Sequence, residues 1–357
     1  MRAYLDVPTG MVRTVLGDIP PGELGITLAH EHLLLTRYRW RREAGLPLPA
    51  VGDDPRSRAP ISLETSAWVR RYGKHIDEPN LTDEAVAIRE AARFAALGGR
   101  TLVDATNVDL TRDPPALGRI ARATGLNIVM GAGHYLGSYH PLDMDTRSED
   151  HLVDEIRRDI TRGADGSQIR SGIIGEIGVE HPMTGNERKS LRAAGRAQRL
   201  TGAPLLVHPG RDPQSPFDVV DVVREAGGDL SRTVIAHIDR TLFDLDDMCR
   251  LAEKGVYLEF DLFGQESSYY QYAPIDMPND ATRIDHLIAL ARAGFGDRLL
   301  IAQDICRKTS LVTWGGWGYG HILENVVPVM RRKGMTDAEI DRMLIDNPAR
   351  MLTFADR

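Results

Sequence analysis

Residues 25–33 read Gly25-Ile-Thr-Leu-Ala-His-Glu-His-Leu33, an apolar and β-branched run that ends in His30-Glu31-His32. Side chains alternate between the two faces of a β-strand, so His30 and His32 point the same way and Glu31 points the opposite way. Two imidazoles side by side at a strand end can bind one metal ion, whereas a helical zinc motif needs its histidines four residues apart. Hydrogen-bonded histidines without a metal are the alternative, and the other strand ends decide between the two.

The composition is typical of a globular chain without a membrane span. Of the 357 residues, 42% are apolar and 27% are charged, and no apolar run is long enough to cross a bilayer. A formal charge of −7 argues against nucleic acid as a partner, because phosphate binding needs clustered positive charge. We expect a small-molecule substrate, no nucleic-acid or membrane partner, and a homodimer as the assembly to test.

The cellular compartment is inferred from two features of the chain. Met1 to Gly10 contains Asp6 and Pro8 where a signal peptide needs an unbroken apolar segment. Cys249 and Cys306 are too few for a disulfide framework. Both features favour a cytoplasmic protein with reduced cysteines.

Strand and helix patterns alternate along most of the chain. A helix is predicted over 83–97 and helical patterns separate the later strands, for example around 284–291. Counted from His30, eight strands are predicted over 25–33, 100–106, 127–131, 172–178, 204–208, 233–237, 256–261 and 298–304. Eight units at roughly 30-residue spacing fit an α/β fold of the (β/α)8 TIM-barrel type. A doubly wound sheet would normally show a glycine-rich phosphate turn after its first strand, and none is present.

We expect one barrel domain over residues 1–357, since barrels of this kind routinely reach this length. A short β-type segment over 12–19 precedes the first barrel strand and is expected to cap one end of the fold. A long insertion over 37–80 has scattered Pro, Gly and charge with no clear period. Such a segment is either a functional loop or lid, or a disordered insertion.

The helix near 152–160 shows the one-sided burial expected of an outer layer. Its period places Leu152, Ile156 and Ile160 on one apolar stripe and turns Glu155 and Asp159 away from it. This pattern predicts a helix that covers a sheet on one side only.

Polar residues interrupt the apolar strands at their carboxyl ends, where barrels of this kind carry their functional groups. These residues are His30, His32, Glu176, His208, His237 and Asp304. A lone histidine at a strand end is often structural, but four histidines and two carboxylates at one barrel mouth are hard to explain as core. One open zinc site uses three protein ligands and water. Six ligands therefore fit a pair of ions better than a single ion, with the two ions about 3.5 to 4 Å apart and a carboxylate bridging them.

Such a site predicts metal-assisted hydrolysis. A water shared by two divalent ions loses a proton near neutral pH, and the resulting hydroxide is the nucleophile. Asp304 would touch one ion, accept the proton of the nucleophile and pass it towards the leaving group. Zinc is the first choice of metal, with manganese or cobalt as alternatives, because the same ligands serve all three.

Several stretches resemble the phosphotriesterase-like family of the amidohydrolase superfamily, and the resemblance covers nearly the whole chain. Besides the opening run over 25–33 they are Gly175-Glu-Ile-Gly178, Pro204-Leu-Leu-Val-His-Pro209, His237-Ile-Asp-Arg-Thr241, Gly315-Gly-Trp-Gly-Tyr-Gly-His-Ile322 and Asn347-Pro-Ala-Arg350. The resemblance implies a distorted barrel with two divalent ions. His30, His32 and Asp304 would hold the more buried ion, and His208 and His237 the more exposed one. Many members bridge the ions with a carboxylated lysine on strand 4, where this chain has Glu176, as in a recognised subgroup.

Substrate preference is the point at which the chain departs from the named members. Lactonases that act on acyl-homoserine lactones carry an arginine after the strand 7 aspartate, and phosphotriesterases carry a histidine there. This chain has Asp261 followed by Leu262. Both activities are therefore weakened as the native role.

Two further residues are candidate substrate-binding groups. Tyr135 resembles a strand 3 tyrosine that faces the metals in lactonase-type members. The alternative is that Tyr135 is a structural aromatic residue that packs over the rim of the barrel. Arg240 follows the strand 6 histidine closely enough to bind a substrate carboxylate or phosphate. It could equally pair with Asp239 or Glu266.

The sequence thus favours a binuclear metal-dependent hydrolase of a small carboxylic ester or lactone. An amidase that acts on N-acyl compounds is the next alternative, and phosphotriester hydrolysis is expected as a side activity. A barrel that keeps its metals but only binds a ligand is the alternative from another class.

Overall fold

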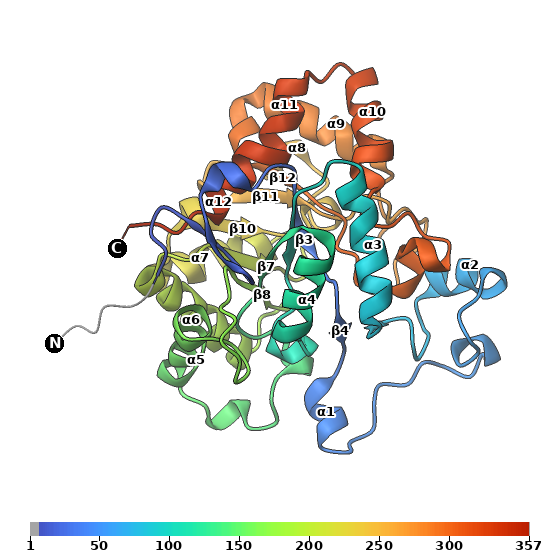
Figure 1. Ribbon diagram of the computed structural model, residues 1–357, viewed down its shortest axis with the longest axis horizontal. Coiled ribbons are helices and arrows are strands. Elements are labelled where there is room, and N and C mark those ends of the chain that lie inside the picture. Colours follow the sequence, from blue (N-terminus) through green and yellow to red (C-terminus); the bar gives the residue numbers. More distant parts are fainter. Residues whose placement is uncertain (1–6, 357) are drawn as a thin grey trace.

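The computed structural model describes residues 7–356, and its centre is a barrel of eight parallel strands (Figure 1). The barrel strands are β3 (Thr27–Glu31), β6 (Thr101–Asp104), β7 (Asn127–Met130), β8 (Ile174–Gly178), β9 (Leu205–His208), β10 (Thr233–Ile235), β11 (Tyr257–Phe260) and β12 (Leu299–Ile301). They form two continuous sheets, β3-β6-β7 and β8-β9-β10-β11-β12. The order along the barrel is the order in the chain, as the (β/α)8 prediction requires.

Two irregular seams join these sheets and distort the barrel. Between β7 and β8, the Gly175 amide donates to the Ala132 carbonyl over 2.7 Å. Between β12 and β3, the Asp304 amide donates to the His30 carbonyl over 3.2 Å. The second seam therefore joins two of the predicted metal ligands through the backbone.

At least one helix follows each barrel strand and lies outside it, and the layer of helices surrounds the strands in Figure 1. In the order of the strands these helices are α3 (Glu84–Ala96), α4 (Pro114–Thr124), α5 (Glu149–Thr161), α6 (Gly185–Thr201), α7 (Ser215–Glu225), α8 (Leu245–Ala252), α9 (Asp280–Leu290) and α10 (Val327–Arg332). The chain continues into α11 (Asp337–Asp341) and α12 (Asn347–Leu352). No helix among residues 7–356 has the length and apolar character needed to span a membrane.

Local sequence explains where these helices begin and end, as α6 illustrates. A capping box opens the helix, because the Thr184 hydroxyl accepts from the Glu187 amide and the Glu187 carboxylate accepts from the Thr184 amide. The helix ends at Gly202, whose φ of 71° suits glycine. A Cβ at this position would lie 2.4 Å from the Ala355 carbonyl oxygen, so glycine is also required for space.

The predicted one-sided burial of α5 is wrong at Asp159. This residue is only 4% exposed, and its carboxylate accepts from the Arg112 guanidinium over 2.5 Å. Arg112 comes from the segment between β6 and α4 and also donates to the Gly131 carbonyl. Helical period cannot reveal that a cation from another unit reaches under the helix and makes burial of a carboxylate possible.

The segment over 12–19 forms the hairpin of β1 (Val12–Thr14) and β2 (Gly17–Ile19). Val12 is fully buried and packs with inward-facing residues of the barrel such as Val103 and Leu206. The Val15 amide donates to the Ile128 carbonyl at the start of β7. The hairpin thus closes the amino end of the barrel, opposite the predicted metal ligands.

The insertion over 37–80 has its own structure, so the alternative of a disordered insertion is wrong. Its ends are joined by the antiparallel pair of β4 (Leu35–Thr36) and β5 (Asn80–Leu81), and it carries α1 (Arg39–Glu43) and α2 (Leu63–Tyr72). Figure 1 shows this segment extending to one side of the barrel. Glu78, only 1% exposed, accepts from the amide and hydroxyl of Thr309. The insertion is thereby attached to the loop that follows β12.

Candidate metal centre

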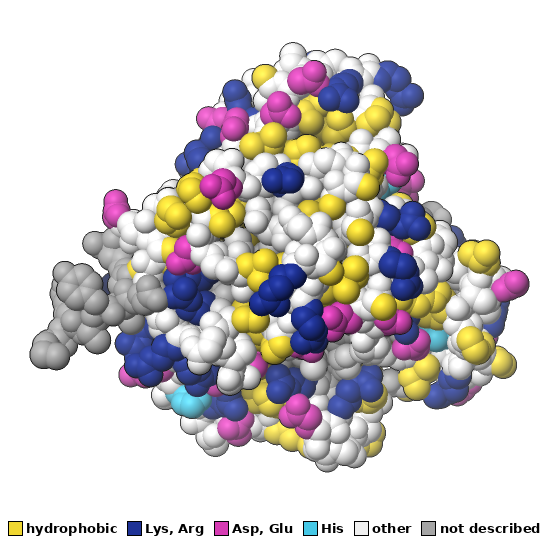
Figure 2. Space-filling model, viewed as in Figure 1, with side chains coloured by type: hydrophobic (Ala, Val, Ile, Leu, Met, Phe, Trp, Pro, Cys, Tyr) yellow, Lys and Arg dark blue, Asp and Glu magenta, His cyan; other side chains and the backbone are white. Residues whose placement is uncertain are grey.

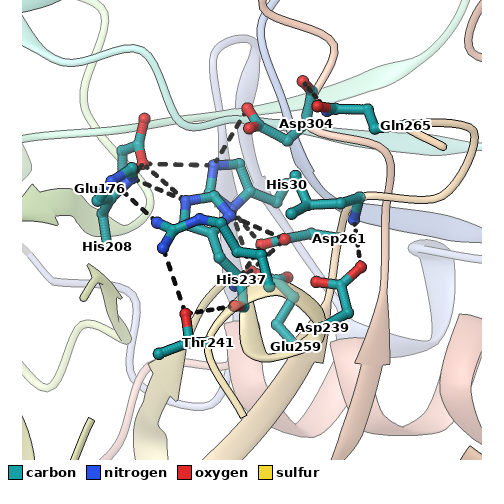
Figure 3. Close-up of polar contacts among 12 residues, drawn as sticks. His30, Glu176, His208, His237, Asp239, Thr241, Glu259, Asp261, Gln265 and Asp304 are labelled. Atoms are coloured by element: carbon teal, nitrogen blue, oxygen red, sulfur yellow. Dashed lines mark hydrogen bonds and ion pairs between the residues drawn. The ribbon is translucent and has the colours of Figure 1, made fainter. Parts of the chain in front are cut away.

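The six predicted ligands lie together at the carboxyl end of the barrel. His30 comes from β3 and His32 directly follows it, Glu176 comes from β8 and His208 from β9, and all four side chains are buried. His237 and Asp304 lie two and three residues past β10 and β12, not in the last residues of the strands as predicted. Their φ angles of 54° and 46° are outside the strand region, so the backbone turns at these points. Figure 3 shows His30, His208, His237 and Asp304 around Glu176.

Glu176 is shared between two groups of histidines. Its Oε1 lies 3.3 Å from His32 Nε2, and its Oε2 lies 3.6 Å from His30 Nε2. The same Oε2 lies 3.0 Å from His208 Nδ1 and 3.6 Å from His237 Nε2. Asp304 joins the first group, because its Oδ1 lies 3.2 Å from His32 Nε2. The cluster therefore contains two sets of candidate ligands with one carboxylate between them.

These residues fit metal ions. Two ligand atoms about 2.1 Å from one tetrahedral ion lie roughly 3.4 Å apart, which is the range of spacings within the cluster. His30 Nε2 is buried with no hydrogen-bond partner among residues 7–356, and an unpaired ring nitrogen in the protein interior is costly unless something else binds it. The ring nitrogens of His30, His32 and His237 that face away from the cluster are already engaged, which leaves the Nε2 atoms available to an ion.

The outward-facing nitrogens bind carboxylates and a hydroxyl, and this set was not predicted from the sequence. Asp261 lies 3.1 Å from His30 Nδ1 and 2.8 Å from His237 Nδ1, and Glu259 lies 3.1 Å from His30 Nδ1. His32 Nδ1 lies 2.8 Å from the Thr106 hydroxyl. Such partners orient metal-binding imidazoles and fix their tautomers. Asp261 with His30 and His237 is therefore a supporting group and not a third metal site.

Titration behaviour follows from this crowding of opposite charges. Burial by itself would raise the pKa of Glu176, but hydrogen bonds from His208, His237 and His32 hold it well below its ordinary value. Burial by itself would lower the pKa of His32, but Asp304 and Glu176 raise it to about 9. The pKa of His208 lies well below its usual value because of burial and the neighbouring His237.

The backbone on both sides of Asp304 is hydrogen-bonded to the Glu31 side chain. The Glu31 carboxylate accepts from the Gln303 and Ile305 amides, each over 2.9 Å. These two amides flank Asp304, whose left-handed φ is uncommon for a residue with a side chain. Glu31 points away from His30 and His32, as the strand alternation predicts, and it positions the strand end that carries Asp304.

Tyr135 and Arg240 both line the cavity above the cluster. The Tyr135 hydroxyl lies 3.3 Å from His208 Nδ1. Arg240 is 2% exposed and pairs with neither Asp239 nor Glu266, so that alternative is wrong. Its guanidinium lies 3.1 Å from His208 Nε2 and donates to the Pro209 carbonyl over 3.2 Å. Burial lowers the pKa of Arg240.

The cavity also contains residues that sequence reasoning missed. It has a volume of about 180 Å³, and its basic and aromatic lining includes Arg37, Arg211, Arg307, Tyr270 and Tyr272. Drug-sized ligands occupy pockets of about 300 to 1,000 Å³, so this cavity suits a small substrate. Arg211 and Arg307 follow predicted ligands by three residues. Examining the loops after each strand for basic residues, and not only the strand ends, would have found them.

The barrel and its cluster of histidines and carboxylates define a hydrolase with a candidate metal-binding group at the barrel mouth. The Phosphotriesterase family model matches residues 10–352, and the chain belongs to that family. N-acetyltaurine hydrolase of Homo sapiens is 42% identical over 349 residues, which is 97% of this chain and 99% of that protein.

Two solved structures have the same fold. A resiniferatoxin-binding protein from Rhodobacter sphaeroides has 38% sequence identity and a TM-score of 0.90, over 97% of this chain and 96% of that chain. The lactonase Lmo2620 from Listeria monocytogenes has 26% identity and a TM-score of 0.79, over 97% and 100% of the two chains.

Proposed function

We propose that this protein is a binuclear metal-dependent hydrolase that cleaves the amide bond of small N-acyl compounds. The observation that carries the proposal is the placement of Glu176 between two sets of ligands, within 3.6 Å of a ring nitrogen on each side. Relatives named N-acetyltaurine hydrolase align over 97% of the chain at 42% identity, against 26% for the lactonase. This difference moves the amide ahead of the ester and lactone that the sequence favoured.

Imidazoles and carboxylates suit zinc, with manganese or cobalt as alternatives. When bound, such ions lower the pKa of a shared water and polarise the acyl carbonyl. His30, His32 and Asp304 would hold one ion, His208 and His237 the other, with Glu176 between them. The cytoplasmic location and the homodimer stay predictions.

The chain's own residues supply proton transfer and orientation. Asp304 lines the cavity, where it can accept a proton from the attacking water. An amide nitrogen must be protonated before it leaves as an amine, so the same carboxyl would then donate that proton. The Tyr135 hydroxyl, on the wall beside His208, can donate a hydrogen bond to the acyl oxygen.

Lactone hydrolysis is the second candidate, supported by the fold match to the Listeria lactonase. Leu262 after Asp261 argues against lactone hydrolysis, since the acyl-homoserine lactonases that the chain resembles carry an arginine at that position.

The proposal is tested by metal analysis together with a substrate panel. We expect about two ions per chain by elemental analysis of protein prepared without chelator. We expect kcat/KM for N-acetyltaurine to exceed that for phenyl acetate, γ-butyrolactone and paraoxon by about tenfold or more, a transition-state difference of about 1.4 kcal/mol. Fewer than one ion per chain under metal-replete conditions, or faster cleavage of the ester or lactone, would contradict it.

A further inference from the structure

Three arginines on the cavity wall have no acidic partner. Arg37 follows β4, Arg211 follows β9 and Arg307 follows β12, so each comes from a different loop at the barrel mouth. None of them forms an ion pair with a carboxylate among residues 7–356. Their polar contacts are weak or neutral: Arg37 approaches Cys306 Sγ at 3.7 Å, and Arg211 donates to the Tyr270 hydroxyl over 3.1 Å.

Arginines buried elsewhere in this protein bind carboxylates, whereas the arginines of this cavity, Arg240 included, bind none in the part of the chain that the structure describes. Arg112 binds Asp159 and Asp165, and Arg283 binds Asp239 and Asp280. The chain carries 51 acidic residues against 44 basic ones, so acidic partners are not scarce. Unpaired guanidinium groups at a cavity wall therefore point to a partner that comes from outside the chain.

The three arginines surround one aromatic side chain. The guanidinium carbon of Arg211 lies 5.0 Å from the centre of the Tyr272 ring, and that of Arg307 lies 6.0 Å from it. Burial by itself would raise the pKa of the Tyr272 phenol, but the charges of Arg37 and Arg307 hold it below its ordinary value. Tyr272 is 44% exposed. A positive potential thus exists where the cavity meets solvent.

The remaining carboxylates of the cavity form no ion pair with the three arginines, although the Glu180 charge acts on Arg211 from a distance. Glu176 and Asp304 belong to the metal cluster, and Glu180 is exposed at the wall without an ion pair to any of the three arginines. Arg240 lies deeper, against His208, so it is placed beside a metal ligand. The cavity therefore has a cluster of ligands on one side and an outer group of three guanidiniums on the other.

We propose that Arg37, Arg211 and Arg307 form a binding subsite for an anionic oxyacid group, a sulfonate or a carboxylate, at the end of the substrate opposite its acyl group. The inference rests on the proposed amide hydrolysis, and it names the substrate class as N-acyl compounds with an acid group on a short linker. Guanidinium groups bind oxyanions through paired N–H donors, and three of them can bind the three oxygens of a sulfonate. A small cavity with a basic end would select against neutral or long N-acyl compounds.

The test compares two substrates of matched length, N-acetyltaurine and N-acetylethanolamine, which differ in a sulfonate and a hydroxyl. Arg211→Met and Arg307→Met should each raise KM for N-acetyltaurine by about tenfold or more, the usual worth of a hydrogen bond to a charged group. kcat should change little, because the contact is made in ground and transition states alike. KM for N-acetylethanolamine should stay within about twofold of the wild-type value.

Control variants separate charge from folding. Arg211→Lys keeps the charge and should raise KM for N-acetyltaurine less than Arg211→Met does. Arg157→Met removes an arginine that pairs with Asp154 on the outer helix α5, and it should leave both substrates unaffected. Circular dichroism melting of each variant checks that the fold is retained.

A binding measurement gives a readout apart from activity. Ethanesulfonate titrated into the metal-loaded protein by calorimetry should bind to the wild type and to Arg157→Met, and about tenfold more weakly to Arg211→Met. If amides are cleaved but neutral and anionic substrates are equivalent in all variants, the subsite is wrong and the amide proposal stands. If no amide is cleaved but ethanesulfonate binding depends on Arg211 and Arg307, the subsite stands and the proposed reaction is wrong.

Discussion

Glu176 is the residue on which both halves of the metal cluster depend. It contacts ring nitrogens of four histidines, and burial alone would raise its pKa. The surrounding histidines lower the pKa well below its ordinary value, so the carboxylate is charged at neutral pH. A charged carboxylate that contacts both sets of ligands is the group that can neutralise two cations at once.

We predict that Glu176→Gln loses metal and activity together, because a neutral amide is a poor bridge between two cations. The metal content per chain, measured by elemental analysis, and the rate of amide hydrolysis should fall in parallel. Glu180→Gln, a change on the exposed wall of the same cavity, is the matched control and should keep its metal.

Glu176→Lys is a sharper test of the same role. Activity that appears only with added bicarbonate would mean that a carboxylated lysine replaces the glutamate. Full metal occupancy and activity in Glu176→Ala would rule the bridging role out.

Asp304 should behave differently, because its proposed role is proton transfer as well as ligation. We predict that Asp304→Asn lowers kcat by about 10² or more, the usual contribution of a positioned general base. The measurement is steady-state kinetics on protein whose metal content has been determined. Near-normal kcat with both ions bound would mean that another group moves the proton.

At the scale of elements, the seam between β3 and β12 positions the site. Glu31 on β3 binds the backbone on both sides of Asp304, and the Asp304 amide binds the His30 carbonyl. The segment that supplies two candidate ligands, His30 and His32, thus also determines where a third candidate lies. An uncommon backbone conformation persists only when its surroundings hold it in place.

We predict that Glu31→Gln lowers the free energy of unfolding by about 1–3 kcal/mol, because an amide group has one acceptor for two buried N–H donors. kcat should fall as well, since the Asp304 segment would shift. Denaturant unfolding measures the first effect. Glu253→Gln, at the exposed end of α8, is the control and should match the wild type. Equal behaviour of the two variants would show that the seam does not depend on Glu31.

At the scale of the whole molecule, the barrel gathers charged groups that bound metal ions would neutralise. On the face shown in Figure 2, acidic and basic side chains are interspersed and neither forms a continuous patch. The buried mouth differs, because four histidines and several carboxylates share it. In the absence of ions we expect His30, His32 and His237, but not His208, to take protons from solvent that balance these carboxylates.

This proton uptake gives the metal-stripped protein a defined pH dependence. Neighbouring carboxylates, through their charge and their hydrogen bonds, outweigh burial and raise the pKa of His30 and His237, and that of His32 to about 9. A histidine with a raised pKa contributes stability that is complete below about 6.5, its unfolded value, and is lost as pH rises through the folded value. Metal binding requires the neutral imidazole, so stabilisation by ions increases over the same range.

We therefore predict that the difference in Tm between metal-loaded and metal-stripped protein widens from pH 6 to pH 9. Thermal unfolding at several pH values, with and without chelator, measures it. A difference that is constant or that shrinks over this range would mean that the histidines do not exchange protons for metal.

Much of this architecture could be read from the chain, because strand alternation and helical period are local properties. The run over 25–33 places two imidazoles on one face without reference to any other segment. Eight apolar strands with polar residues near their carboxyl ends then lead to a barrel mouth, since parallel strands bring those ends to one edge. The six candidate ligands follow from these two rules alone.

The remaining features arise only when the barrel closes. Arg37, Arg211 and Arg307 stand far apart in loops with no period, and only closure brings them around Tyr272. Asp159 looks like a surface carboxylate until the Arg112 side chain reaches it from another unit. The periodicity of the sequence predicts on which face of its own helix or strand a residue lies. Charge pairing depends instead on which loops come together in the folded protein. The candidate metal ligands are therefore visible in the sequence, and the residues proposed to choose the substrate are visible only in the folded barrel.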